Sequence, residues 1–375
     1  MLSFTLDVPT EKELVRLQAA IVGAWRELSS LSPAEAEYLH RQALISTIGA
    51  STRIENAVLT DQEIDWVDTT LSQDGRTTAF DSRRSFIVDK LSKDRQRSIE
   101  EVAGCREMLT TIYQQAAELF PLSEVYVRGL HHDLLRYFPQ AQSYAGGYKA
   151  APNKVVSRDH ETGRQETVLE PADPGIMTQT ATAELIAWYN DAIREMAWAV
   201  PVAVEFVFRF LAIHPFQDGN GRLGRGLFLL ALLQSEDRQL REVVRYLAVD
   251  RHIEKNKALY YKVLHQASNG TFHQDPGQYH YGPLVRFFLK IIAAALGDID
   301  IYRTRYANLV RLSESARSVL DSFRASPEQR LKVGDLEAQT TLPRRTIQYA
   351  LKTLTDKGFV QRLGSGAGSR YQLVF

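Results

Sequence analysis

The spacing of apolar residues along most of this chain is that of amphipathic helices. From Leu14 to Leu28 apolar positions recur at intervals of three and four residues, and similar spacing predicts a second helix from Pro33 towards Ile54. In three places a hydroxyl residue precedes a glutamate by three positions, a pattern that caps the first turn of a helix. These pairs are Thr10 with Glu13, Ser32 with Glu35, and Thr60 with Glu63.

Two segments depart from this helical spacing. Residues 72–100 are polar with few apolar positions, so we expect mainly loop and one short helix there. Between 146 and 174, Val155–Val156 and Thr167–Leu169 flank the polar turn DHETG, which predicts a β-hairpin. The sequence therefore predicts an all-α fold with one hairpin, its later helices at 101–120, 123–138, 178–197, 201–213, 221–234, 239–250, 254–268 and 282–312.

The last sixty or so residues change character. They predict helices at 313–323, at 333–339 and after Pro343, and then two strands on either side of the turn GSGAGS. Three helices and a hairpin in this order resemble a winged helix-turn-helix domain. Residues 313–375 hold ten Lys or Arg against six Asp or Glu, a net charge of +4. DNA is therefore one expected partner of this segment, and a protein contact is the alternative.

Composition excludes several classes of protein. Among 375 residues, 44% are hydrophobic, 24% are charged and the charges balance at 45 of each sign, so disorder of the whole chain and a wholly polybasic character are excluded. Cys105 is the only cysteine, which excludes an intramolecular disulfide framework and a Cys-rich zinc module. Acidic residues near the start and the short apolar runs argue against a signal peptide and a membrane span. We expect a cytoplasmic protein.

The segment HPFQDGNGRLGR, from His214 to Arg225, holds the most informative chemistry. Three turn-prone residues precede an apolar helix, and exposed N–H groups at a helix start favour anions. Arg222 and Arg225 share one face there and suit a polyphosphate. Asp218 suits Mg²⁺, and His214 can take a proton near neutral pH. These residues indicate transfer of a phosphate-containing group to a hydroxyl. The alternative is a buried helix–turn–helix corner with a structural histidine.

The same segment is similar to the signature of the Fic family, H-x-F-x-[D/E]-G-N-G-R-x-x-R, and every fixed position is filled. The context from about residue 30 to 300 resembles a Fic core of helices with a hairpin flap. The resemblance implies an adenylyltransferase that binds ATP with Mg²⁺ and transfers AMP to a Ser, Thr or Tyr hydroxyl of a protein. The chain itself is one candidate for that protein.

The resemblance also implies roles for single residues. His214 would be the general base and Asp218 the Mg²⁺ ligand. Gly219, Asn220 (including its side-chain amide) and Gly221 would contact the phosphates of the nucleotide. Arg222 would lie near the β-phosphate and Arg225 near the γ-phosphate. Tyr261 and Asn269 would lie near the adenosine. Asn269 is alternatively a helix C-cap. Lys149 stands where the family often has Arg.

A second family pattern, [S/T]-x-x-x-E-[G/N], is filled from Ser51 to Asn56. The resemblance implies an inhibitory helix in which Glu55 pairs with Arg225 in fork geometry and competes with the γ-phosphate. Elsewhere, His131, His132 and Asp133 fit no standard zinc spacing, and we interpret these histidines as lying on a helix surface or in a loop.

The expected domains are 1–100 with the inhibitory motif, 101–312 as the Fic core, and 313–375 as the winged helix. Three other functions stay open beside regulated adenylylation: a nucleotide-sensing DNA-binding regulator, transfer of another phosphate-linked group, and removal of AMP from a modified protein. A homodimer is also compatible with the sequence.

Overall fold

The computed structural model describes residues 1–72, 79–158 and 165–374. They form two compact units: Met1–Ala57 with Glu100–Ile299, and Val58–Ile99 with the chain from Asp300 onward. This division differs from the expected domains 1–100, 101–312 and 313–375. The reason is packing, because the Ser51–Asn56 segment belongs to the first unit, whereas Val58–Ile99 packs with the C-terminal helices.

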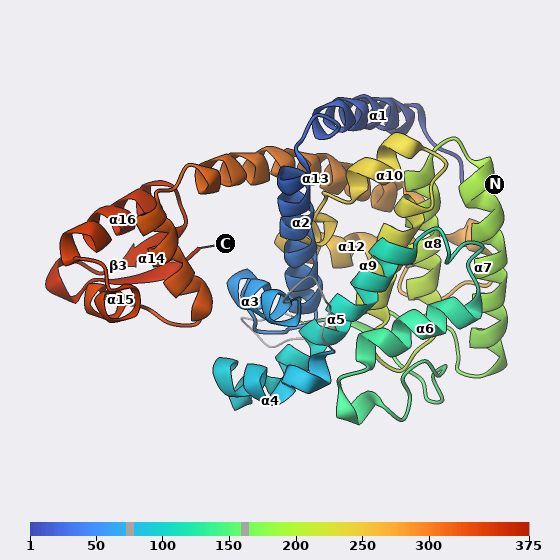
Figure 1. Ribbon diagram of the computed structural model, residues 1–375. Helices are drawn as coiled ribbons and strands as arrows, with labels where there is room; N and C mark the ends of the chain where they lie inside the picture. The colour runs from blue at the N-terminus through green and yellow to red at the C-terminus, as the bar shows by residue number, and fades with distance from the viewer. Residues whose placement is uncertain (73–78, 159–164, 375) are drawn as a thin grey trace. The chain divides into compact units, whose positions relative to one another are not determined.

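The first unit is built from helices (Figure 1). The bounds are α1 Val8–Leu28, α2 Pro33–Ile54, α5 Gln96–Gln115, α6 Glu124–Leu135, α7 Ile176–Glu195, α8 Ala199–Ile213, α9 Asn220–Leu233, α10 Arg238–Val244, α11 Val249–Lys255, α12 Lys257–Ser268 and α13 Tyr281–Val310. α5 and α13 cross the boundaries between the units. The segment predicted as one helix over 239–250 is broken into α10 and the start of α11.

The centre of this unit is the packed pair of helices α8 and α9, with α8 also packed on α7. Nearly every residue of both helices is buried, as their apolar sequences require. A Cβ at Gly224 would lie 3.2 Å from the Leu211 side chain, so this glycine lets the two helices approach closely. The short turn that joins α8 to α9 is therefore held at both ends by a tightly packed core.

The predicted hairpin is present as β1 Val155–Arg158 and β2 Gln165–Leu169, paired antiparallel. The DHETG turn predicted to connect the strands lies outside the described residues. An isolated bridge between Tyr148 and Phe216 joins the segment before the hairpin to the α8–α9 turn. The hairpin is thus anchored beside that turn.

The second unit contains α3 Asp61–Leu71, α4 Phe80–Leu91, α14 Glu314–Ala325, α15 Val333–Thr340 and α16 Arg344–Asp356, with the antiparallel strands β3 Val360–Leu363 and β4 Arg370–Leu373. Val319, Phe323, Leu336, Ile347 and Leu354 form its fully buried core. The predicted order of three helices and two strands after residue 312 is confirmed.

Two local predictions were wrong. The segment 72–100 is not mainly loop, because α4 covers Phe80–Leu91 and α5 begins at Gln96; the few apolar residues of α4 are enough to bury one face. Asp7 rather than Thr10 caps α1, and it accepts the Thr10 N–H (2.8 Å). The capping box of Thr60 and Glu63 is confirmed. Among the described residues, no helix has the length and apolarity needed to cross a membrane.

Candidate active site

The turn between α8 and α9 places the signature residues. His214 ends α8 in the left-handed conformation (φ 52°), and Gly219 precedes α9 with φ 81°, where glycine is favoured. The Asn220 side chain closes the turn by accepting the Phe216 N–H (3.0 Å) and donating to the Phe216 carbonyl (2.7 Å). Its carboxamide therefore holds the loop, in contrast to the expectation that it would face a ligand. Phe216 is fully buried.

His131 of α6 contacts the same turn through a hydrogen bond and a ring stack. Its Nδ1 accepts the Gly146 N–H (2.8 Å), so Nε2 carries the proton and donates to the Asp218 carbonyl (2.9 Å). The ring stacks on Phe216 at 3.9 Å and has no exposed surface. Burial lowers the pKa of His131 to about 4, which keeps it neutral. The interpretation of His131 as a surface or loop histidine was wrong.

Lys149 connects the approach to the hairpin with the end of α8. Its N–H donates to the Pro215 carbonyl (2.8 Å), and its ammonium donates to the Ile213 carbonyl (3.0 Å) and to Asn153 Oδ1 (3.1 Å). Only 3% of the residue is exposed, and burial lowers the pKa of Lys149 to about 8. This cation therefore satisfies a helix-terminal carbonyl and fixes the hairpin beside His214.

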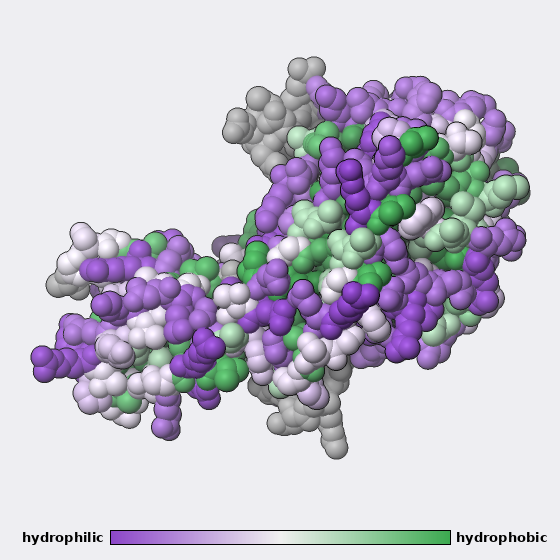
Figure 2. Space-filling model, turned by 90° about the horizontal axis from the view of Figure 1, so that it is seen from above, coloured by the Kyte–Doolittle hydropathy of each residue, from purple (hydrophilic) through white to green (hydrophobic). Residues whose placement is uncertain are grey.

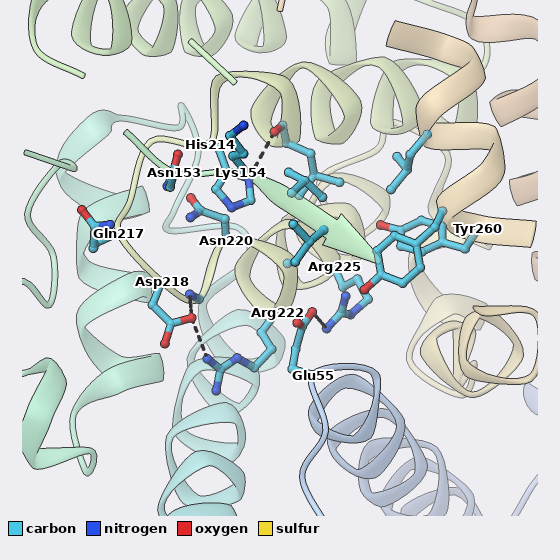
Figure 3. A pocket seen from close by; sticks show the side chains of 17 residues that line it. Glu55, Asn153, Lys154, His214, Gln217, Asp218, Asn220, Arg222, Arg225 and Tyr260 are labelled. Atoms are coloured by element: carbon cyan, nitrogen blue, oxygen red, sulfur yellow. Dashed lines mark hydrogen bonds and ion pairs between the residues drawn. The ribbon is translucent and has the colours of Figure 1, made fainter. Parts of the chain in front are cut away.

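A cavity of about 220 Å³ opens above the turn (Figure 3). Most of the candidate site residues predicted from the sequence line this cavity, namely Glu55, His214, Asp218, Gly219, Asn220, Gly221, Arg222, Arg225 and Tyr261. Asn153, Lys154, Val155 and Val156 line it from the hairpin side. Asn269 does not line it; this residue ends α12 in the left-handed conformation (φ 52°), which is the C-cap alternative.

His214 faces this cavity as a neutral base. Its Nδ1 lies 3.2 Å from the Leu211 carbonyl, which can only accept, so Nδ1 carries the proton and Nε2 is the basic nitrogen. Burial, with a smaller effect of the Lys149 charge, lowers the pKa of His214 to about 4. The imidazole is therefore unprotonated at neutral pH, as a general base requires.

Two guanidinium groups form the opposite wall of the cavity. Arg222 is 3% exposed and lies 3.5 Å from Asp218 and 4.0 Å from Glu101. Its Nε and Nη1 are buried and have no hydrogen-bond partner among the described residues. Buried donors of this kind are rare in folded proteins and fit an anionic ligand.

Arg225 is bonded to Ser51 and Glu55 of the Ser51–Asn56 segment. Its Nε donates to Ser51 Oγ (3.0 Å), and Nη2 donates to the Ser51 carbonyl (2.8 Å) and to Glu55 Oε1 (3.0 Å). Asp250 Oδ2 lies 3.4 Å from Nε. The predicted pair of Glu55 and Arg225 is present, but it has one hydrogen bond instead of two parallel ones. The reason is that Ser51 and Asp250 also contact the guanidinium.

The Glu55 carboxylate also lies against the first turn of α9, since a Cβ at Gly221 would overlap its Oε1. An acidic group at this helix start takes the position that suits an anion. The end of α2 is held there by two further contacts: Arg53 makes a two-bond ion pair with Glu254 (2.7 and 3.0 Å), and Lys257 donates to the Ile54 carbonyl (2.6 Å).

Comparison with known proteins agrees with this geometry. Residues 121–232 match the model of the Fic/DOC family. The chain carries a Fic/DOC domain. Proteins with this domain are typically transferases that use nucleotide substrates with a metal. The matched range contains His131, Lys149 and the whole signature loop, whereas Glu55, Asp250 and Tyr261 lie outside it.

Solved structures share the helical fold of this chain. A Fic family protein from Desulfovibrio desulfuricans aligns over 100% of this chain and 98% of its own, with a TM-score of 0.56 and 22% identity. A Fic domain-containing signalling protein from Bacteroides thetaiotaomicron aligns over 78% and 96%, with a TM-score of 0.55 and 22% identity. A Fic-1 fragment from C. elegans aligns over 78% and 71%, with a TM-score of 0.52 and 17% identity.

Three contacts made around Arg225 and the end of α2 were missed by sequence reasoning. Asp250 on α11 pairs with Arg225, and Glu254 and Lys257 hold the end of α2. No local pattern marks these residues, because each acts on a partner far away in the sequence. His131 was noticed as part of a His-His-Asp run, and its place on the predicted apolar face of α6 was the available signal.

Proposed function

We propose that this protein is a Mg²⁺-dependent adenylyltransferase that transfers AMP from ATP to a Ser, Thr or Tyr hydroxyl of a protein and is restrained by Glu55. The observation that carries the proposal is the shared cavity of a neutral His214, the N-terminus of α9 and two buried arginines. A base, a phosphate cradle and a site for a second substrate are the requirements of such a reaction.

His214 supplies the proton acceptor. Nε2 takes the proton of the incoming hydroxyl, whose oxygen forms a bond to the α-phosphorus of ATP. The bond from that phosphorus to the bridging oxygen breaks, and pyrophosphate leaves with the electron pair. No covalent intermediate with the protein is needed, so positioning and charge stabilisation provide the rate acceleration.

The phosphates would be held by residues that already lie together. The first N–H groups of α9 and the guanidinium of Arg222, which lines the cavity, suit the phosphate oxygens, and Arg225 becomes available once Glu55 withdraws. Among the described residues no group of three acidic, His or Cys side chains could hold a metal ion. Mg²⁺ suits Asp218 because it needs few protein ligands when phosphates and water supply the rest, and it would neutralise phosphate charge.

The inhibitory role of Glu55 rests on where its carboxylate lies. It bonds Arg225 and covers Gly221, both of which line the cavity. With Glu55 in place the cavity of about 220 Å³ is smaller than the roughly 300–1,000 Å³ typical of ligand sites. The two effects, occupied volume and a neutralised cation, both oppose a bound triphosphate.

The proposal is tested by mass spectrometry of the intact Glu55→Gly protein after incubation with Mg²⁺ and ATP, CTP, GTP or UTP in parallel. We expect an adduct of one adenylyl group with ATP alone, and none in the matched Glu55→Gly/His214→Ala protein. A uridylyl or phosphoryl adduct would replace adenylyl transfer by one of the other group transfers. Loss of AMP from a pre-labelled protein, without any transfer, would instead identify a hydrolase.

A further inference from the structure

Two helices of the second unit form a tight helix–turn–helix. α15 ends at Thr340 and α16 begins at Arg344, and Thr341 between them adopts the left-handed conformation (φ 57°). Such a three-residue turn is typical of motifs that present their second helix to a partner. α16 contacts both α14 and α15 and buries Ile347, Ala350, Leu351 and Leu354, so its remaining face is turned away from the core.

That remaining face carries Arg345, Gln348, Tyr349 and Lys352, all exposed. Tyr349 is 72% exposed, which is unusual for a large aromatic side chain. No hydrogen bond or ion pair engages the side chains of Arg345 and Lys352 among the described residues. Arg344, by contrast, is paired with Glu337 (2.9 Å). Two free cations therefore lie two helical turns apart, about 10 Å along one face.

The strands after α16 add further polar groups. Gln361, Arg362 and Arg370 are exposed on β3 and β4. The Arg362 guanidinium donates two bonds to Ser369 Oγ (3.1 and 2.8 Å) and so ties the turn between the strands. Figure 2 shows hydrophilic surface over much of the C-terminal part, at the left of the view. The β3–β4 hairpin thus adds two exposed arginines, one of which is bonded within the hairpin.

We propose that α16 binds duplex DNA in the major groove, with the β3–β4 hairpin on the neighbouring phosphates. The major groove is about 12 Å wide and admits one α-helix, and two cations about 10 Å apart can reach phosphates on its edges. Gln348 lies between them and can bond an adenine edge, while Tyr349 offers both a hydroxyl and apolar contact. An acidic protein surface would account for the cations but gives no reason for the amide and the aromatic ring on the same face.

The test uses the full-length chain and fluorescence anisotropy with labelled duplexes of random sequence, at about 50 and 200 mM salt. We expect salt-dependent binding that weakens at least about tenfold in Arg345→Gln/Lys352→Gln, with a salt slope lower by about 1.8 for two lost phosphate contacts. The matched control, Arg311→Gln/Arg324→Gln, removes the same charge from other exposed positions of this unit and should bind like wild type. Circular dichroism of each variant checks that the fold is retained.

Three results would overturn the inference: no binding even at low salt, equal loss in the control variant, or displacement of the duplex by polyglutamate at equal charge concentration. The last result would assign the surface to an acidic protein. Because the proposed transfer chemistry is located in the other unit, His214→Ala should leave DNA binding unchanged. Failure of DNA binding is therefore distinguishable from failure of the adenylylation proposal.

Discussion

Glu55 and Arg225 are 170 positions apart in the sequence, yet the Arg225 guanidinium donates to the Glu55 carboxylate at 3.0 Å. The arginine is 4% exposed, whereas 33% of the Glu55 side chain is exposed, so this charge-assisted bond lies in a partly dry site. The contact connects the end of α2 to the first turns of α9, where the phosphates are proposed to bind. The proposed restraint by Glu55 would therefore act directly at the proposed phosphate site.

Replacing Glu55 by Gly should raise the rate of self-adenylylation by about tenfold or more. A hydrogen bond to a charged group contributes about 1.5–3 kcal/mol, and 1.4 kcal/mol corresponds to a factor of ten. The rate is measured with labelled ATP, and Glu55→Gln serves as the matched variant. Glutamine keeps the bulk but loses the charge, so its rate should fall between wild type and Glu55→Gly. Equal rates in all three proteins would exclude Glu55 as the restraint.

The ion pair of Arg53 with Glu254 should strengthen the same restraint. Its two bonds hold the last turn of α2 against α11, and both side chains are partly exposed, at 24% and 29%. Exposed pairs contribute about 0.2–1 kcal/mol, so Arg53→Gln and Glu254→Gln should each raise the basal rate by a few-fold. The double variant should gain no more than either single variant.

The control for this prediction is the exposed pair of Arg238 and Glu242 on α10, at 2.7 Å. Arg238→Gln removes a comparable surface ion pair that does not involve α2, and its basal rate should equal that of wild type. If the increases in basal rate from Arg53→Gln and Glu254→Gln were additive, the two residues would act separately and not as one ion pair.

The signature loop could be predicted from sequence because its parts are adjacent. Twelve consecutive residues between two apolar helices contain the histidine, the carboxylate, the glycines and both arginines. Local geometry then determines most of their placement, since a helix start always presents its N–H groups to whatever lies before it. The helices of the core were predicted for the same reason, as periodicity is local.

The contacts that organise this loop could not be predicted in the same way. His131 reaches the Asp218 carbonyl 87 positions away, and Asp250 reaches Arg225 from another helix. Nothing in the sequence near Asn220 shows whether its amide faces a ligand or the Phe216 backbone. Such choices depend on which groups the completed fold buries together, as does the grouping of Val58–Ile99 with the C-terminal helices.

Two buried histidines should make the protein less stable in mild acid. The pKa values of His131 and His214 are both about 4, lowered mainly by burial, against about 6.5 in an unfolded chain. Between these values the unfolded state binds more protons, so stability rises with pH and is lost as pH falls from about 6.5 to 4. The loss is on the order of 2–3 kcal/mol for each histidine.

This dependence is measured from urea unfolding midpoints between about pH 4.5 and 7. His131→Gln should be less stable than wild type at pH 7, because the hydrogen bonds of His131 to the Asp218 carbonyl and the Gly146 N–H are disturbed. The stability of this variant should nevertheless vary less with pH. A wild-type midpoint that stays constant across this range would contradict the burial argument. His132→Gln is the control, since its side chain is 58% exposed.

Asp250 should position Arg225 for the nucleotide after Glu55 has withdrawn. Its carboxylate is 6% exposed and lies 3.4 Å from the guanidinium, and burial raises its pKa although Arg225 opposes the shift. In the Glu55→Gly background, Asp250→Asn leaves Ser51 and the Tyr260 side chain as described hydrogen-bond partners of Arg225. We expect the KM for ATP to rise by about tenfold while kcat changes little, since a group that orients a phosphate contact affects binding in the ground and transition states alike. The control is Asp298→Asn, which removes a buried carboxylate that is bonded to His252 and does not line the cavity, and it should leave the KM for ATP unchanged. If Asp250→Asn instead lowers kcat and leaves KM unchanged, Asp250 acts in the chemical step.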